Sequence, residues 1–435
     1  MTLPGRIIEI AINADHAFQT IDGFGVNINA KAWELRLAPV LELLTHDLGA
    51  TLFRVDSFGT STWPDPDGTL GPRALDADRL AAIYQGPTAR RGWALMRALN
   101  ERGIAPYLAC SGIVPRWMCA EDGQTLADFE RFAAMLVSLV EWAKRREGLH
   151  FTLFGPLNET NLGPPEGPRV GPEAYARVLE VLDRTLAARG LDDIRFVVAE
   201  EAGMSTAYMR PILASNAAWR VAVWGMHCYG WYSAAQFQEV VRLAGTTPVW
   251  MTEYGDLEQT GEREWEVAWA MTQRLFDLLE GGMRGALVWD AYDNYHDHDE
   301  HWTIYGLIRT GLRAYTPKHR FFAQQQVFRF VRPGMVRVAA SSPDPELRVL
   351  AFASPDRRQV TVVGTNAAQR PRHLNVALDG FPADVTGGRV AYYRTSAHER
   401  CARVADVPAR SGHWPVTGVD VIVPPESIVT LTNVA

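Results

Sequence analysis

The sequence predicts an α/β fold, a (β/α)8 TIM barrel with an accessory antiparallel β-sandwich. Short apolar runs rich in β-branched residues alternate with helical patterns between about residues 20 and 320. Several helical patterns end in glycine, which suits a left-handed helix C-cap. After residue 334 the helical patterns give way to short alternating runs separated by turn residues, a texture typical of a sandwich.

Each of the eight predicted barrel strands has the composition of a strand buried on both faces, which favours a closed parallel barrel over an open sheet. The strands are expected at 20–26, 51–57, 105–111, 151–157, 194–199, 221–227, 248–253 and 286–290. Helices are expected between them at 35–48, 90–102, 126–146, 172–189, 233–244 and 262–280, with a last helix at 317–331. The unit between residues 199 and 221 carries the weakest helical pattern.

The domain boundary is expected at Arg332-Pro333-Gly334, where the last barrel helix ends. Residues 19–331 then form the barrel and residues 332–435 the sandwich, with strands at 336–340, 347–353, 360–365, 390–393, 419–423 and 428–433. An alternating run at 6–12 precedes the barrel, so residues 1–18 are expected to add a strand to the sandwich. No low-complexity linker separates the domains, which predicts that they pack rigidly.

Composition narrows the class of protein. The chain has 435 residues, 47% hydrophobic and 21% charged, as in a soluble globular protein. A net charge of −7 without a basic stripe argues against a nucleic-acid partner, and no apolar window is long enough for a membrane span. The start lacks the apolar run of a secretory signal, and the four cysteines are scattered, so we expect a reduced, cytoplasmic protein. The oligomeric state is unknown from the sequence.

Two glutamates stand at the ends of two predicted barrel strands. The run 151–157 leads into Asn158-Glu159, and the run 248–252 delivers Glu253. Barrels build their sites at the carboxyl ends of their strands, and the chain between the glutamates suits about three strand–helix units. A glycosidase needs two carboxyl groups, one to exchange a proton and one to attack the sugar or activate water. The pair therefore predicts a glycoside hydrolase that needs no cofactor.

These motifs are similar to those of the clan A retaining glycoside hydrolases, most closely glycoside hydrolase family 30. The resemblance covers nearly the whole chain and is carried by residues 19–25 (QTIDGFG), 111–118 (SGIVPRWM), Asn158-Glu159, Thr252-Glu253 and the 332–334 transition. It implies a barrel with a β-sandwich built from both chain ends, and hydrolysis of a β-type glycosidic bond by double displacement. Glu159 matches the acid/base and Glu253 the nucleophile. The segments 26–29 and 254–256 depart from the family pattern.

Further residues are candidates for binding a carbohydrate substrate. Arg54 could stand as a fixed cation beside Glu253, and Asn158 could donate to the 2-hydroxyl of the sugar, its alternative being a loop cap. The resemblance suggests that His227 and Tyr229 line the site, with Tyr229 donating to Glu253; the alternative is a pair of satisfied core residues. The remaining candidates are Trp289 as the floor of the sugar site, Trp117 as a wall, and Asn29 after the first strand.

Two other groups compete for a functional role. Glu200 and Glu201 form a second carboxylate pair at the end of strand 5, but adjacent strand residues point to opposite sides, so one at most reaches the cleft. The loop 290–302 holds three histidines and several carboxylates, which could bind a divalent metal or shape the substrate site. A metal-dependent barrel hydrolase using that loop, and a non-catalytic carbohydrate-binding protein, are therefore the alternatives. A small glycoside or oligosaccharide is the expected substrate.

Overall fold

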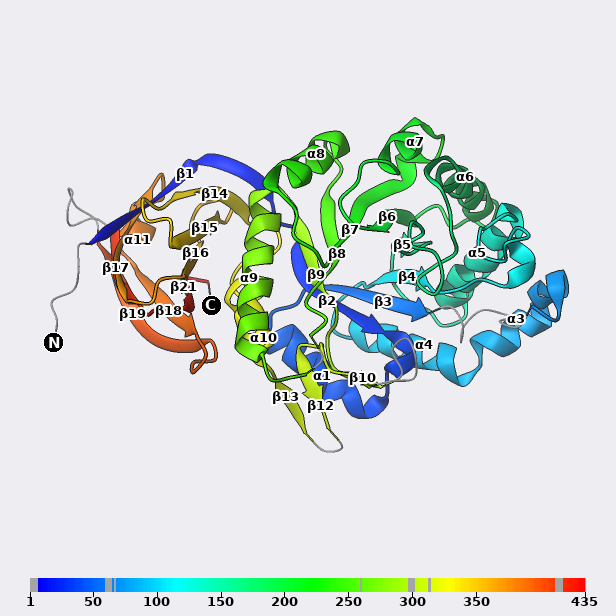
Figure 1. The fold of residues 1–435 in the computed structure, drawn as a ribbon, viewed down its shortest axis with the longest axis horizontal. Coiled ribbons are helices and arrows are strands. Elements are labelled where there is room, and N and C mark those ends of the chain that lie inside the picture. The colour runs from blue at the N-terminus through cyan, green and yellow to red at the C-terminus, as the bar shows by residue number, and fades with distance from the viewer. Residues whose placement is uncertain are drawn as a thin grey trace.

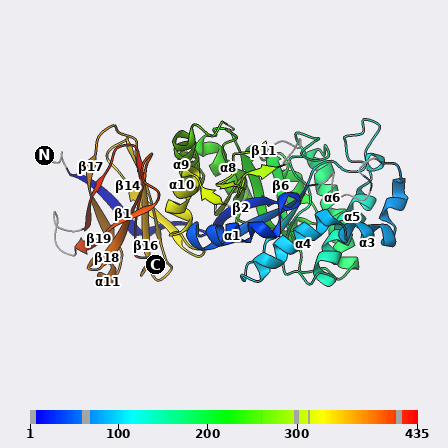
Figure 2. The same cartoon turned by 90° about the horizontal axis from the view of Figure 1, so that it is seen from below.

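The computed structural model describes residues 7–58, 65, 68–258, 260–295, 302–311, 314–410 and 418–434. It shows two closed β-sheets side by side along an elongated molecule (Figures 1 and 2). The larger body is a barrel wrapped in helices, and the smaller is an all-β domain that holds the N-terminal strand. No helix in the described segments is both long and apolar enough to cross a membrane.

The barrel is the predicted (β/α)8 barrel. Its parallel strands follow in chain order, and the last pairs with the first to close the sheet. They are β2 (Gly23–Asn29), β3 (Leu52–Phe58), β4 (Tyr107–Ser111), β5 (Leu153–Gly155), β6 (Arg195–Ala202), β7 (Val221–Cys228), β8 (Val249–Tyr254) and β9 (Gly285–Val288). The first barrel strand lies three residues later than predicted, because the preceding strand β1 (Ile8–Thr20) extends as far as Thr20.

Helices cover the outside of the barrel (Figure 1). They are α1 (Ala38–Glu42), α3 (Ala77–Tyr84), α4 (Pro87–Asn100), α5 (Phe129–Arg145), α6 (Pro172–Ala188), α7 (Met209–Ala214), α8 (Ala234–Ala244), α9 (Glu264–Glu280) and α10 (His319–Phe328). The single regular helix predicted at 35–48 is wrong. The segment instead forms a 3-10 turn, then α1, and then a π-helical turn at Leu43–Asp47. Helix α3 is not among the predicted elements. The others bury one apolar stripe against the strands, as Phe132, Leu136 and Val140 of α5 do.

The second domain is a closed sheet in the order β1–β14–β15–β16–β21–β18–β19–β20–β17. Its further strands are β14 (Val336–Ser341), β15 (Leu347–Ala353), β16 (Val360–Asn366), β17 (Arg372–Asp379), β18 (Arg389–Thr395), β19 (Ala402–Arg410), β20 (Gly418–Val423) and β21 (Ser427–Thr432), with a short helix α11 (Ala383–Thr386). The predicted antiparallel β domain is present, and its sheet also contains one parallel pair, because β1 pairs antiparallel with β14 but parallel with β17. A strand from the far end of the chain thus covers two sheet edges at once.

Helices α9 and α10 lie between the barrel and the β domain (Figure 1). The buried amide of Gln326 on α10 donates to Thr395 Oγ1 at 2.7 Å, and Thr430 Oγ1 donates to the Gln326 carbonyl at 2.8 Å. Arg348 of β15 pairs with Asp277 of α9 at 2.8 Å. A buried amide costs free energy unless it is hydrogen-bonded, and here the partners come from the other domain, which fixes the two domains relative to each other.

Two small hairpins follow the last barrel strand. They pair β10 (Asn294–Tyr295) with β11 (Trp302–Thr303), and β12 (Ile308–Thr310) with β13 (Tyr315–Pro317). Lys318 Nζ lies 2.7 Å from Asp293 Oδ1, and both side chains are almost fully buried. This ion pair ties the start of the 290–302 loop to the chain just before α10.

Candidate active site

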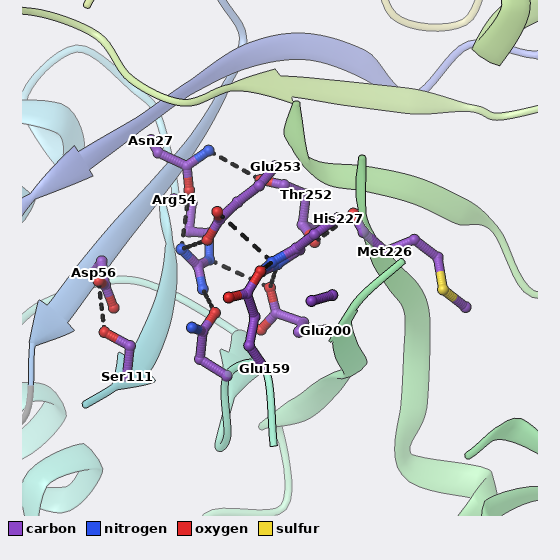
Figure 3. Close-up of polar contacts among 12 residues, drawn as sticks. Asn27, Arg54, Asp56, Ser111, Glu159, Glu200, Met226, His227, Thr252 and Glu253 are labelled. Atoms are coloured by element: carbon purple, nitrogen blue, oxygen red, sulfur yellow. Dashed lines mark hydrogen bonds and ion pairs between the residues drawn. The ribbon is translucent and has the colours of Figure 1, made fainter. Parts of the chain in front are cut away.

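The two predicted glutamates lie together at the carboxyl ends of the barrel strands (Figure 3). Glu159 follows β5 and Glu253 is on β8, and their exposed fractions are only 7% and 6%. One carboxyl oxygen of each, together with a ring nitrogen of His227, lies within 4.8 Å of the others. The two carboxyl groups therefore lie at the close separation that a retaining glycosidase uses, about 5 Å.

Two donors hold the carboxylate of Glu253. Arg54 Nη1 lies 2.8 Å from Oε1, and the hydroxyl of Tyr229 donates to Oε2 at 2.7 Å. Arg54 comes from β3, whereas Tyr229 follows β7, so strands on both sides of the site fix one side chain. Hydrogen bonds from a cation and a hydroxyl favour the ionised form of a carboxyl group.

Arg54 is completely buried and connects four partners besides Glu253. Its Nη2 donates to Asn158 Oδ1 at 2.8 Å, its Nη1 to Asn27 Oδ1 at 3.0 Å, and its Nε to the hydroxyl of Tyr107 at 2.7 Å. Its Nε also lies 3.2 Å from Glu200 Oε1. Burial alone would lower the pKa of Arg54, but Tyr107 and the nearby carboxylates raise it well above its usual range. The guanidinium is thus a permanent cation inside the barrel.

The two asparagine amides beside Arg54 are oriented by the protein. Asn158 accepts from Arg54, and its Nδ2 donates to the carbonyl of Glu166 at 3.3 Å. Asn27 also accepts from Arg54, and its Nδ2 donates to the carbonyl of Thr252 at 2.9 Å, one residue before Glu253. Asn27 therefore links β2 to β8 directly behind the carboxylate (Figure 3).

His227 lies between the acidic side chains. Its Nδ1 is 2.7 Å from Glu159 Oε1 and 3.6 Å from Glu253 Oε2, and its Nε2 is 3.7 Å from Glu200 Oε1. Burial lowers the pKa of His227, but the attraction of Glu253, Glu159 and Glu200 outweighs it and raises the pKa to about 10. The imidazole is therefore a second buried cation at neutral pH.

Burial also alters the acidity of Glu253. It raises the pKa of Glu253 to about 7, and the repulsion from Glu159 adds to that rise, against the lowering by His227 and Arg54. Below about pH 7 the site thus keeps a carboxyl proton that a reaction can use.

A divalent metal is the other species that this geometry could accept. Glu159, His227 and Glu253 bring three ligand atoms within 4.8 Å of one another. However, Arg54 already occupies Glu253 Oε1, and the cationic form of His227 has no lone pair to offer a metal. The alternative that assigned a metal to the loop 290–302 rests on residues 296–301, which lie outside the described residues.

The remaining sequence candidates are Trp289, Asn29 and Trp117. Trp289 is buried directly after β9, and Asn29 Oδ1 accepts from the backbone of Lys31 and caps a 3-10 turn. Trp117 lies on a 3-10 turn after β4, where its Nε1 donates to Asp65 at 2.9 Å. Asp65 also accepts from three backbone amides of its own loop, so Trp117 is tied to a loop rather than standing free.

Sequence reasoning missed Asn27, Tyr107 and the part played by Glu200. All three are buried side chains that bind Arg54, and they come from β2, β4 and β6. Asn27 had one available signal, since an amide in the middle of an apolar strand must find partners inside the barrel. Tyr107 offered none, because a tyrosine in an apolar run is an ordinary core residue.

No family model matches the sequence. Solved structures nevertheless match it over nearly its full length. A glycoside hydrolase family 30 subfamily 8 xylanase, Xyn30A from Clostridium acetobutylicum, is 19% identical with a TM-score of 0.74, covering 98% of this chain and 100% of that one. SrfJ from Salmonella typhimurium is 16% identical with a TM-score of 0.73, covering 100% and 94%. The endo-beta1,6-glucanase BT3312 is 16% identical with a TM-score of 0.70, covering 98% and 94%. The chain has the clan A fold of the family 30 glycoside hydrolases, both barrel and β domain.

Proposed function

We propose that this protein is a retaining glycoside hydrolase that cleaves a β-type O-glycosidic bond. The observation that carries the proposal is the pairing of Glu159 and Glu253, with one oxygen of each within 4.8 Å, at the carboxyl ends of β5 and β8. Such a gap has room for attack by one carboxylate but not for a water molecule between the carboxylate and the sugar, as inversion requires.

Glu253 is the nucleophile in this proposal. The donors Arg54 and Tyr229 hold both of its oxygens and stabilise its negative charge. Glu159 is the acid/base, because Arg54 and Tyr229 hold the other carboxyl group in the position of the nucleophile. Glu159 first protonates the leaving oxygen while Glu253 attacks the anomeric carbon. Glu159 then takes a proton from the water that releases the sugar from Glu253.

The substrate proposed is a β-linked carbohydrate, and the relatives in fold suggest where to begin. The solved structures of this fold include proteins named as xylanases and a β1,6-glucanase. A panel of aryl β-xylosides, β-glucosides and β-galactosides therefore offers the first test, with short β-xylo- and β-1,6-gluco-oligosaccharides beside it. Turnover of one class names the sugar; tight binding without turnover would instead favour a carbohydrate-binding protein.

Azide rescue of two alanine variants tests the roles. Glu159→Ala should keep activity only on a glycoside with an activated leaving group, and azide should restore turnover to give a β-glycosyl azide. Glu253→Ala should be inactive alone and yield an α-glycosyl azide, because azide attacks the opposite face. Glu141→Ala on the exposed face of α5 is the control and should behave as wild type. Activity of Glu253→Ala without azide, abolished by a chelator, would overturn the proposal in favour of a metal-dependent hydrolase.

A further inference from the structure

A third glutamate, Glu200, lies beneath the two proposed catalytic groups and takes no part in the mechanism above. It is on β6 at a break in the strand register, because Ala199 pairs with Gly225 and Glu201 with Met226. Glu200 is therefore the extra residue of a β-bulge, and its φ of 54° is one that side chains other than glycine rarely adopt. Bulges re-aim side chains, and this one directs Glu200 into the barrel (Figure 3).

The same bulge fixes the backbone of the proposed acid/base. The Glu159 amide donates to the Glu200 carbonyl at 2.8 Å, and Glu159 also has a positive φ, 40°. Two unfavourable backbone conformations on neighbouring strands are thus joined by one hydrogen bond. Strain of this kind persists only where the surroundings hold it, and it gathers at functional sites.

The barrel interior is shaped to admit this side chain. Neighbouring strands carry glycine on both sides of Glu200: a Cβ at Gly155 would lie 2.3 Å from its Oε2, and a Cβ at Gly225 would lie 2.9 Å from its Cγ. Real side chains do not approach so closely, so neither position accepts even an alanine while Glu200 keeps its place. The two glycines give Glu200 the room it occupies.

The carboxylate faces both buried cations from the inner side. Its Oε1 accepts a hydrogen bond from the Tyr107 hydroxyl, lies 3.2 Å from Arg54 Nε, and lies 3.7 Å from His227 Nε2. The other ends of these cations reach the proposed catalytic pair, with Arg54 on Glu253 and His227 on Glu159. Glu200 is fully buried and too deep to be a substrate contact. It therefore acts on the site only through other residues.

We propose that Glu200 is a positioning residue, whose carboxylate holds Arg54 and His227 in place against Glu253 and Glu159 and balances their charge. This inference rests on the proposed function only where it predicts an effect on kcat. The position and charge of Glu200 can be tested without any turnover. In direct contact, the two cations Arg54 and His227 face the carboxyl groups of Glu159, Glu200 and Glu253.

Removing the charge of Glu200 would take away a negative charge that lies next to both cations, so a carboxyl proton in the cluster would leave more easily. The titratable and charged side chains around the cluster are Arg54, Asp56, Tyr107, Cys110, Glu159, Glu200, Glu201, His227, Tyr229 and Glu253. Among these, the tyrosine and cysteine pKa values are raised, chiefly by burial, so these groups stay neutral.

Glu200→Gln tests the proposal because it removes the charge and keeps the shape. The glutamine oxygen can still accept from Tyr107, so the fold should persist, as thermal unfolding will show. We expect kcat to fall about 10- to 100-fold with KM nearly unchanged. The upper pH limit of kcat/KM should move down by about one pH unit or more, because removing the negative charge of Glu200 lowers the pKa of Glu253. A purely structural role would lower the melting temperature and leave the pH profile where it is, which would overturn the proposal.

Glu201→Gln is the matched control. Glu201 is the next residue of the same bulge and is also buried, but its carboxyl group forms no ion pair with Arg54 or His227 in the described segments and acts on His227 only at longer range. Its substitution should move the pH profile less than Glu200→Gln does. Tyr107→Phe is a milder second variant that loosens Glu200 from Arg54 without changing any charge; it should lower kcat and keep KM, and an unchanged kcat would count against the proposal.

A titration that needs no activity separates this inference from the proposed function. In protein with labelled histidines, the imidazole of His227 can be followed by NMR and assigned by comparison with His227→Gln. Glu200→Gln should lower the His227 pKa from about 10 by one unit or more, and Glu201→Gln should change it less. If the wild type turns over no glycoside but the His227 pKa falls, only the function fails. If the pKa stays, the positioning role is wrong.

Discussion

Arg54 Nη1 lies 2.8 Å from Glu253 Oε1, and neither residue is more than 6% exposed. The pair sits inside a closed barrel, where removing one partner leaves an uncompensated charge. Arg54→Lys keeps the charge but cannot reach Glu253, Asn158 and Tyr107 at once. We predict that kcat/KM falls by at least about 100-fold, since several fixed donors are lost together. Steady-state kinetics on the best aryl glycoside checks this. If Arg54→Lys kept a kcat/KM near that of the wild type, the simultaneous contacts of the Arg54 guanidinium would not be needed for activity.

The Tyr229 hydroxyl donates to Glu253 Oε2 at 2.7 Å. Tyr229→Phe removes a hydrogen bond to a charged group, which corresponds to about 10- to 100-fold in kcat/KM. Tyr254→Phe is the matched control, because the hydroxyl of Tyr254 donates to Gln324 of α10 at 2.8 Å, outside the barrel. It should lower the melting temperature and spare kcat/KM. Equal kinetic losses in both variants would contradict the role given to Tyr229.

The pH dependence of kcat/KM should show its upper limit at about pH 7. The pKa of Glu253 is raised to about 7, chiefly by burial. Above that pH the site loses the carboxyl proton that the reaction needs, and kcat/KM should fall about tenfold per pH unit. His227 should not titrate in this range, since its pKa is raised to about 10. A profile that rises through pH 7 would contradict this assignment.

Glu201 should destabilise the fold at alkaline pH. Burial raises its pKa to about 8, and its Oε1 has no hydrogen-bond partner in the described segments. When the pKa of a carboxyl group is higher in the folded state than in the unfolded state, the fold becomes less stable as the pH rises between the two values. For Glu201 that range runs from the unfolded pKa of about 4.3 to the folded pKa of about 8. Glu201→Gln should thus melt at nearly the same temperature as wild type near pH 4 and at a higher temperature near pH 9. A constant difference across that range would show that Glu201 is not buried as described.

The barrel could be predicted because each strand is an apolar run. The polar residue that follows such a run marks the end of the strand, which is where barrels carry their functional groups. Glu159 and Glu253 stand out for that reason. The β domain was harder to read. Strand β19 (Ala402–Arg410) has mostly exposed residues and buries little beyond Ala409, and β17 (Arg372–Asp379) mixes charged residues with apolar ones. The parallel pairing of β1 with β17 joins distant parts of the chain, and no local pattern encodes it.

The network behind the carboxylates was predictable only in part. Arg54 is an arginine in an apolar strand, so a buried partner had to exist, and Glu253 was the natural choice. Glu200 could not be placed, because its direction depends on a bulge and a positive φ that a strand pattern does not reveal. The role of Trp117 as a sugar wall stays a prediction; the structure adds that Asp65 accepts a hydrogen bond from its N–H, which no sequence pattern revealed.

Covalent trapping tests the central claim most directly. A 2-deoxy-2-fluoro-β-glycoside with a good leaving group, of the sugar that the aryl glycoside panel selects, should react once and stay bound, because fluorine slows release of the sugar. Intact-mass spectrometry should then show one added fluorosugar, and peptide mapping should place it on Glu253, with none on Glu253→Gln. A label on another residue, or hydrolysis of the unmodified glycoside with inverted anomeric configuration, would contradict the account.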